Sequence, residues 1–523
     1  MRKRLFAAVC MGLAVAACVP AVNAYASTDH YANASTLKSR EGWDSWVKDW
    51  NSIAKDDTKV SMAPGADETQ LNFAWYSKVI SGQKDTPIVL IGTDKSKLKK
   101  FTGKVNPVDK ALTGGVSYVS NKVTVTGLKP GTKYYYTVEK NGIQSEVRSY
   151  TLSDTADTKI LVVGDPQIGA SKGQVQGTEQ LVADDGVANT AARNDSYNWD
   201  RTLTIAASMN KDLDFIISAG DQINKTGKPK EEEYAGFLNA NELQYLPLAS
   251  TIGNHDSLNE DYGDHFNTPN QTGYGETKAG GDYYYSYGNG LFIVLNTNNY
   301  NVAEHEKTLQ KAIASDPDAQ WRIVTIHQDI YGSGMDHSDT DGMILRTQLT
   351  PLFDQYNVDV VLQGHDHTYS RSKLLYGDAQ THDNYKFQLM PDGSDYDWAH
   401  AFDVTTQAQI TLEPEESDQS GQKALENFQN DNKCYTIENT QGDTVTNPKG
   451  TLYMTANSAS GSKYYELISA QQDYIAKRSQ NWLPSYSVID MTKDHFAITT
   501  YQITEDNQVV PIDDTFTINK TNQ

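Results

Sequence analysis

Five short apolar runs along this chain end in the same few polar residues, and no other feature limits its fold so strongly. The runs with their endings are ILVVGDPQ at 160–167, FIISAGD at 215–221, ASTIGNHD at 249–256, IVTIH at 323–327 and VDVVLQGHDH at 358–367. Short apolar runs bounded by turn signals are typical of buried strands. In open α/β sheets, sites form beyond the carboxyl ends of the strands. We therefore expect the polar endings to gather at one site.

Strand and helix signals alternate from residue 158 to about 370, which predicts a layered α/β core. Within this core, residues 281–297 are predicted to form a β-hairpin. The preceding segment, 60–152, has apolar residues at a spacing of two, which predicts an all-β sandwich. Its sequence LKPGTKY at 128–134 resembles the corner of fibronectin type III domains, in which a tyrosine hydroxyl ties the turn to the strand.

Three further segments carry weaker signals. Residues 27–59 are expected to hold a helix whose tryptophans pack on a neighbouring domain, and an aromatic binding surface is the alternative. The polar stretch 170–200 is expected to cover the site. The acidic stretch 376–448 is predicted to be a solvated surface insertion. It interrupts a catalytic domain that is assigned to 153–523 and is β-rich toward its end.

Residues 1–26 are typical of a bacterial secretory signal peptide. Basic residues at 2–4 precede an apolar stretch and then small residues at the spacing of a cleavage site. We therefore expect a secreted, extracellular or cell-surface protein. A lipoprotein signal, with Cys18 lipidated, is the alternative. Cleaved secretion leaves Cys434 as the only cysteine, so no disulfide is expected within one chain. No later run is long and apolar enough to span a membrane.

The charge of the chain argues against a nucleic-acid partner. There are 45 Lys and Arg residues against 67 Asp and Glu residues, which gives a formal net charge of −22. No basic cluster lies outside the N-terminus. A protein that binds nucleic acid needs a basic face to neutralise phosphates.

The residue types at the strand ends are those of a metal site. As candidate ligands, the five endings supply two Asp, one Gln, one Asn and several His residues. Carboxylates, amide oxygens and imidazoles are the ligands of hard and borderline divalent metals. The set is large enough for two ions, which a shared carboxylate would hold about 3.5–4 Å apart.

The order GD, GD, GNHD, VxxH and GHxH resembles the calcineurin-like metallophosphoesterase superfamily and, within it, the purple acid phosphatases. The resemblance implies a β-sandwich core flanked by helices, behind a fibronectin type III-like sandwich. It also implies two divalent or trivalent ions (Fe, Mn or Zn). By position, it assigns one ligand to both metals, two to the first metal and three to the second: Asp221 to both, Asp165 and His367 to the first, and Asn254, His327 and His365 to the second.

Other residues near these motifs have implied roles or depart from the family pattern. His255 would face the leaving group, and Asp256 would orient its ring. Where many metallophosphoesterases have a histidine, this chain has Gln167, which is either a weaker ligand of the first metal or a hydrogen-bonding neighbour of it. Where purple acid phosphatases have a tyrosine, it has Asn224. His337 either contacts the substrate phosphate or is an exposed loop residue.

The resemblance implies a phosphatase that acts on a small phosphorylated substrate. A metal-bound hydroxide would attack a phosphate monoester, and His255 would give a proton to the departing alkoxide. A phosphodiesterase or nucleotidase on the same scaffold is one alternative. A secreted surface-binding protein with an inactive metal domain is another.

Overall fold

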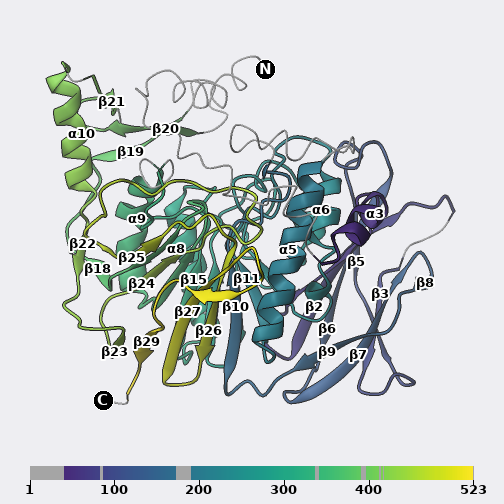
Figure 1. Ribbon diagram of the computed structural model, residues 1–523. Coiled ribbons are helices and arrows are strands. Elements are labelled where there is room, and N and C mark those ends of the chain that lie inside the picture. Colours follow the sequence, from purple (N-terminus) through teal and green to yellow (C-terminus); the bar gives the residue numbers. More distant parts are fainter. Residues whose placement is uncertain are drawn as a thin grey trace.

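The computed structural model describes residues 41–82, 86–171, 190–335, 341–389, 396–411, 414–415 and 417–521. The predicted signal peptide, Cys18 and His337 lie outside these residues. A small β-sandwich comes first along the chain, and a larger unit with two sheets follows it (Figure 1). Among the described residues, we find no helix with the length and apolar character that a membrane span requires.

The small sandwich consists of two antiparallel sheets, in the orders β1-β2-β6-β5 and β4-β3-β7-β8, with β9 also paired to β7. Its hydroxyl-tied corner is present, because the Lys129 backbone N–H donates to the Tyr134 hydroxyl at 2.8 Å. The strands are β1 (Val60–Pro64), β2 (Gln70–Lys78), β3 (Ile88–Gly92), β4 (Lys99–Thr102), β5 (Lys104–Pro107), β6 (Tyr118–Thr126), β7 (Thr132–Lys140), β8 (Ile143–Gln144) and β9 (Arg148–Leu152).

The larger unit is built on two sheets that face each other. The first has the order β12-β11-β10-β26-β27-β29-β23, with β28 on β27, and the second has the order β13-β14-β15-β16-β24-β17-β25. The first sheet comprises β10 (Thr158–Val163), β11 (Phe215–Ser218), β12 (Leu248–Ser250), β23 (Thr444–Thr446), β26 (Ser485–Met491), β27 (His495–Ile503), β28 (Val509–Pro511) and β29 (Phe516–Asn519). The second comprises β13 (Tyr283–Tyr287), β14 (Gly290–Val294), β15 (Trp321–Thr325), β16 (Val360–Gln363), β17 (Tyr369–Ser372), β24 (Leu452–Thr455) and β25 (Ile475–Ser479).

The central strands are apolar on both faces because each face has its own core. In β10, Ile160 and Val162 pack between the two sheets, whereas Leu161 and Val163 pack under helices on the outer face. In β14, alternate residues divide in the same way. The covering helices are α5 (Thr190–Met209) and α6 (Glu231–Phe237) on the first sheet, and α8 (Val302–Ser315) and α9 (Asp341–Gln355) on the second. The result is a helix-sheet-sheet-helix sandwich, which confirms the predicted fold class.

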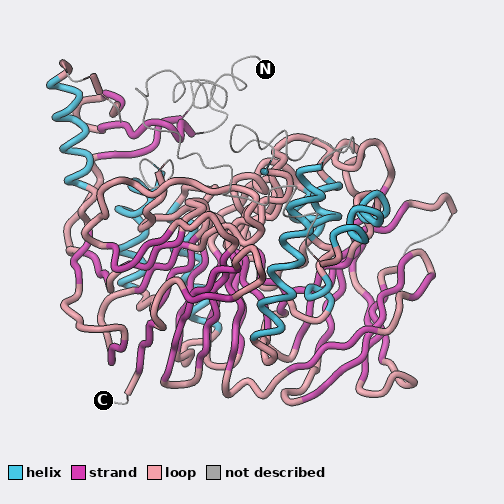
Figure 2. The backbone as a smooth tube through the Cα atoms, viewed as in Figure 1, coloured by secondary structure: helices cyan, strands magenta, loops and turns pink. Residues whose placement is uncertain are grey.

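Parallel pairing brings the carboxyl ends of the key strands to common edges. β10, β11 and β12 pair in parallel, as do β14, β15, β16 and β24. The predicted hairpin is confirmed by the antiparallel pairing of β13 with β14. Many of the longest loops lie beyond one end of these strands (Figure 2). This arrangement lets side chains from five separate strand ends meet.

The tryptophan-rich segment packs inward as predicted. It forms helix α3 (Trp43–Ile53), in which Trp43 and Trp50 are buried. The indole of Trp46 donates to the Arg193 carbonyl at 3.0 Å, and Trp43 meets the Tyr197 ring edge to face at 5.1 Å. Both partners belong to α5, so these aromatic rings attach the N-terminal segment to the larger unit.

Two polar stretches have more structure than their composition suggests. Of the first, which was predicted to cover the site, residues 172–189 lie outside the described residues. Residues 190–209 form α5, whose buried face carries polar side chains such as Arg193 and Asn194, which hides the helical period from the sequence. The stretch 376–448 is not wholly solvated as predicted, because two of its own side chains, Phe387 and Phe428, are buried. The elements of this region are β18 (Leu375–Gly377), β19 (Tyr385–Leu389), β20 (Tyr396–Asp403), β21 (Ala408–Gln409), α10 (Gln419–Asp431) and β22 (Tyr435–Ile437). Part of it projects from the body beside α10 (Figure 1).

Candidate metal centre

Five of the predicted ligands have left-handed backbone, which is rare for residues other than glycine. Such residues are costly and persist where the surrounding structure holds them, most often at functional sites. Here each one turns the chain sharply beyond the end of a strand, and the side chains converge. They are Asp165 (φ 40°), Gln167 (φ 36°), Asp221 (φ 48°), His365 (φ 69°) and His367 (φ 48°).

Glycines in the motifs leave room for the carboxylates. A Cβ atom on Gly253 would lie 2.0 Å from Oδ1 of Asp221, and one on Gly364 would lie 2.7 Å from Oδ2 of Asp165. Cβ contacts this short do not occur without displacement of one partner. The small residue before Asn254 and before His365 is therefore required by the close approach of the neighbouring carboxylates.

One group of candidate ligands consists of Asp221, His327 and His365, whose ligand atoms lie within 4.8 Å of one another. Asn254 joins this group, because its Oδ1 lies 2.9 Å from Nε2 of His327. Nδ1 of His327 donates to the carbonyl of Ala219 at 2.9 Å, which directs Nε2 into the group. Two lone pairs would face each other across the short contact to Asn254 unless a proton or cation lay between them. The geometry therefore fits a cation.

The second group consists of Asp165, Asp221 and His367, so Asp221 is common to both groups. Nε2 of His367 lies 3.6 Å from Oδ1 of Asp165, and Nδ1 of His367 donates to the carbonyl of Lys463 at 2.8 Å. Gln167 is fully buried, and neither atom of its amide has a hydrogen-bond partner among the described residues. Buried polar groups are normally paired. The unpaired amide fits a ligand for an ion bound beside Asp165.

The charges in the cluster depend strongly on one another. Burial, reinforced by the charge of Asp221, raises the pKa of Asp165 to about 8. Burial acts to raise the pKa of Asp221 as well, but His327 and His255 hold it below its usual range. Burial opposes protonation of His327, yet the carboxylates raise its pKa to about 9. A buried cluster that retains protons in this way has a strong need for positive charge, which bound metal ions would supply.

His255 lies beside the shared carboxylate, but Asp256 does not orient it. The backbone N–H of His255 donates to Oδ1 of Asp221 at 2.9 Å, and its Nε2 lies 4.0 Å from Oδ2 of Asp221. Nδ1 of the ring pairs with the carbonyl of Asn224. The carboxylate of Asp256 instead accepts from the Gly253 N–H at 3.0 Å. The prediction that Asp256 orients the His255 ring is therefore wrong, because Asp256 serves to hold its own turn.

Asn224, at the position of the family tyrosine, acts through its backbone. Its carbonyl orients His255, while its side-chain amide lies 3.4 Å from the Gly169 carbonyl. Burial, partly opposed by Asp221, lowers the pKa of His255. The residue that sets the tautomer of His255 was therefore missed, because a backbone contact of this kind leaves no mark in the sequence.

The loop 456–465 also reaches the site and was not predicted. It follows β24, whose carboxyl end lies beside that of β16. The sequence does contain a signal, since the apolar run at 451–455 ends in the polar stretch ANSASGSK. That ending lacks Asp and His, which is why it did not resemble the other five.

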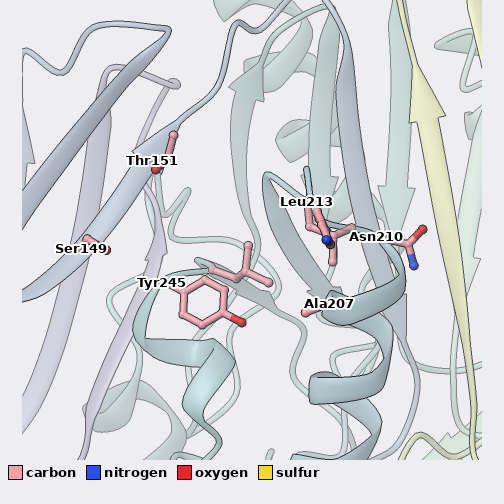
Figure 3. Close-up of a pocket in the computed structure, with 8 residues that line it drawn as sticks. Ser149, Thr151, Ala207, Asn210, Leu213 and Tyr245 are labelled. Atoms are coloured by element: carbon pink, nitrogen blue, oxygen red, sulfur yellow. The ribbon is translucent and has the colours of Figure 1, made fainter.

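A separate cavity of about 270 Å³ lies between the small sandwich and the larger unit (Figure 3). None of its lining residues belongs to either group of candidate ligands. Its lining includes Ser149 and Thr151 of β9, Ala207 of α5, Leu213 and Tyr245. The cavity and the candidate metal centre are therefore different places.

Comparison with known proteins agrees with the fold. Residues 158–369 match the family model of calcineurin-like phosphoesterases, and residues 58–152 match that of the purple acid phosphatase N-terminal domain. The solved structure of purple acid phosphatase PPD1 from yellow lupin seeds has a similar fold, with a TM-score of 0.57 and 15% sequence identity. The match covers 88% of this chain and 75% of that one.

Curated relatives are distant. An uncharacterized protein of Mycobacterium tuberculosis is 23% identical over 336 residues, which cover 59% of this chain and 60% of that protein. Purple acid phosphatase 23 of Arabidopsis thaliana is 24% identical over 363 residues, which cover 64% of this chain and 72% of that protein. The chain thus spans about three fifths of the Mycobacterium relative. The predicted resemblance is confirmed: residues 158–369 match the calcineurin-like phosphoesterase family, and residues 58–152 before them match the purple acid phosphatase N-terminal domain.

Proposed function

We propose that this protein is a secreted, metal-dependent phosphatase that hydrolyses phosphate monoesters. The observation that carries the proposal is the pair of buried ligand groups that share Asp221. The family and fold matches support the reaction class, and the predicted signal peptide at 1–26 supports secretion. The proposed substrate is a small phosphorylated molecule, because the acidic net charge of the chain argues against a nucleic acid.

The ligands divide between two ions of Fe, Mn or Zn. The first ion is assigned to Asp165, Gln167, Asp221 and His367, and the second to Asp221, Asn254, His327 and His365. When bound, such ions neutralise phosphoryl oxygens and lower the pKa of a coordinated water toward neutrality. The unpaired Gln167 amide and the short contact between His327 and Asn254 support this assignment.

His255 is the proposed catalytic acid. A carbonyl oxygen can only accept a hydrogen bond, so the contact with Asn224 places a proton on Nδ1 of the ring. Nε2 then faces the shared carboxylate of Asp221. In the protonated ring, the proton on Nε2 is the one available to the departing alkoxide. His337, which lies outside the described residues, is proposed to contact the substrate phosphate.

The direct test combines metal analysis of the purified protein with release of phosphate from aryl monoesters and diesters. We expect about two ions per chain and faster turnover of the monoester. His365→Ala should abolish turnover, whereas Asp490→Ala should not, because Asp490 is an exposed surface residue paired with Lys159. A metal-loaded protein that releases no phosphate, or full activity of His365→Ala, would refute the proposal. Faster diester turnover would assign a phosphodiesterase instead.

A further inference from the structure

The loop 456–465 is hydrogen-bonded to the turn that carries Asp165, a candidate ligand of the first metal. The Ala459 backbone N–H donates to the Gly164 carbonyl at 2.8 Å, and the Ser458 hydroxyl donates to the Asp165 carbonyl at 3.0 Å. The Ser462 hydroxyl donates to the Pro166 carbonyl, also at 3.0 Å. Three small residues thus tie this loop to the turn that presents Asp165. The loop is part of the centre even though it supplies no predicted ligand.

The far end of the same loop is tied to His367. The Lys463 carbonyl accepts from Nδ1 of His367 at 2.8 Å. The side-chain amide of Gln480 bridges the two segments, since it donates to the carbonyls of His367 at 2.8 Å and Tyr465 at 2.6 Å. The backbone of Lys463 is therefore held on both sides, and its side chain starts from a defined position beside the metal ligands.

The ammonium group of Lys463 stays close to this position. Nζ lies 4.6 Å from the centroid of the Tyr465 ring, and that ring meets the His367 ring edge to face at 5.3 Å. A cation over an aromatic face is a favourable pairing that limits the freedom of a long side chain. Lys463 and Tyr465 are both partly exposed. The charge thus lies at the accessible side of the centre.

The electrostatic effect of Lys463 reaches several residues of the centre. Burial, and after it the charge of Lys463, holds the pKa of His367 well below its usual value. The same charge opposes the rise that burial causes in the pKa of Asp165, and it adds to the fall that burial causes in the pKa of His255; it is a smaller cause than burial at both residues. The charge of Lys463 therefore affects the pKa of residues on both sides of the Asp221 carboxylate.

The ammonium group of Lys463 lies at the accessible side of the candidate metal centre, where it can meet an anion that enters the site. This position is favourable as soon as an anion occupies the site, because ammonium and phosphate form strong charge-assisted hydrogen bonds. We infer that Lys463 binds the phosphoryl group of the substrate from the side of Asp165 and His367. This inference rests on the proposed function and adds to it a residue that binds substrate.

The test compares Lys463→Met, which keeps the length of the side chain without its charge, with Lys463→Arg. Lys449→Met is the matched control, because Lys449 also lies over a tyrosine ring, with Nζ 3.7 Å from the Tyr376 centroid. Lys449 precedes β24, whereas Lys463 follows it, so the control lies at the opposite end of that strand. Metal content, the dissociation constant of inorganic phosphate by calorimetry, and KM and kcat are measured for each protein.

We expect Lys463→Met to retain its metal, to bind inorganic phosphate about tenfold more weakly and to raise KM by a similar factor, as loss of a hydrogen bond to a charged group implies. Lys463→Arg should recover most of the loss, and Lys449→Met should match the wild type. Unchanged phosphate binding in Lys463→Met would overturn the inference, as would loss of metal from that variant. A wild-type protein that binds metal and phosphate but releases no phosphate from esters would refute the proposed function alone.

Discussion

The candidate centre has two halves, one for each proposed metal ion. They differ in how completely the protein orients the ligand side chains. In the second-metal half, His327 is directed by the Ala219 carbonyl and lies 2.9 Å from Asn254. In the first-metal half, the side-chain amide of Gln167 has no hydrogen-bond partner among the described residues. One half is thus built from mutually oriented side chains, whereas the other includes a buried amide without a hydrogen-bond partner in the described part of the chain.

This difference predicts unequal affinity. Imidazole is a stronger ligand than a neutral amide for borderline metals such as Zn²⁺, and the second-metal half has two histidines against one in the first. A lysine ammonium also lies beside the first-metal half and opposes the binding of a cation there. We therefore expect the first metal to be bound more weakly and to leave first when a chelator is added.

The largest effect is expected from Asp221→Ala, which removes the ligand common to both halves. Activity should fall by more than the ~100-fold that loss of a residue around the metal ligands costs. Both ions should be lost on dialysis, as measured by elemental analysis, while the far-ultraviolet circular dichroism spectrum is retained. Full retention of both ions would show that Asp221 does not connect the two halves.

A pair of variants tests whether the halves are separate. His327→Ala should lose the second metal and keep the first, and His367→Ala should do the reverse, because each histidine belongs to a single group. Ions per chain are counted after dialysis, together with phosphate release. If each variant lost both ions, the halves would bind as one unit and the predicted inequality would disappear.

Much of the fold and of the ligand set could be predicted because both leave regular marks in the sequence. Strands such as β10 are apolar on both faces, and each ends in Gly-Asp, Gly-Asn or His. Glycine is required where a Cβ would meet the carboxylate of Asp221 or Asp165. Steric and ligand requirements of this kind restrict residue identity directly, so they can be recognised.

Contacts made by the backbone could not be predicted in the same way. The carbonyls of Asn224 and Lys463 orient His255 and His367, and any residue has a carbonyl. The prediction for Asp256 was wrong for this reason, since adjacency in sequence did not place its carboxylate near the ring. The period of α5 was hidden because the helix buries polar side chains rather than apolar ones.

Substitutions of Gln167 sharpen the comparison by changing the weaker half alone. Gln167→His should strengthen binding of the first metal, and Gln167→Leu should weaken it by about tenfold or more, since even residues around the ligands contribute ~10-fold to 100-fold. Titration with Zn²⁺ in a competing chelator measures both sites. The second site should be unchanged, which serves as an internal control.

Gln167→Leu also decides between the two roles considered for this residue. If Gln167 is a direct ligand, Gln167→Leu should lower the affinity of the first site for metal without changing the pH dependence of metal binding at the second site. If Gln167→Leu retained wild-type affinity at the first site, Gln167 would be a neighbour of the metal and not its ligand. The first-metal half would then depend on Asp165, Asp221 and His367 alone.

The smallest effect is expected at Asp195, which supports the first-metal half from α5. Its Oδ2 accepts from the backbone N–H groups of Gly169 at 2.8 Å and Ser171 at 3.3 Å, and so holds the segment that follows Gln167. Asp195→Ala should weaken the first site by about tenfold, the lower end of the range for residues around a metal. Asp195→Asn, which retains an acceptor, should lie closer to the wild type. Asp200→Ala is the matched control.

The control is informative because Asp200 also lies on α5 but accepts from the backbone N–H of Asn241, in a different segment of the chain. In a zinc titration, Asp195→Ala should therefore bind Zn²⁺ more weakly at the first site than Asp200→Ala and the wild type do. At the second site, the three proteins should have the same affinity. Equal weakening of both sites in Asp195→Ala would mean that α5 supports the centre as a whole. In that case the difference between the halves would arise from the ligands themselves, with no contribution from the segment that carries Gln167.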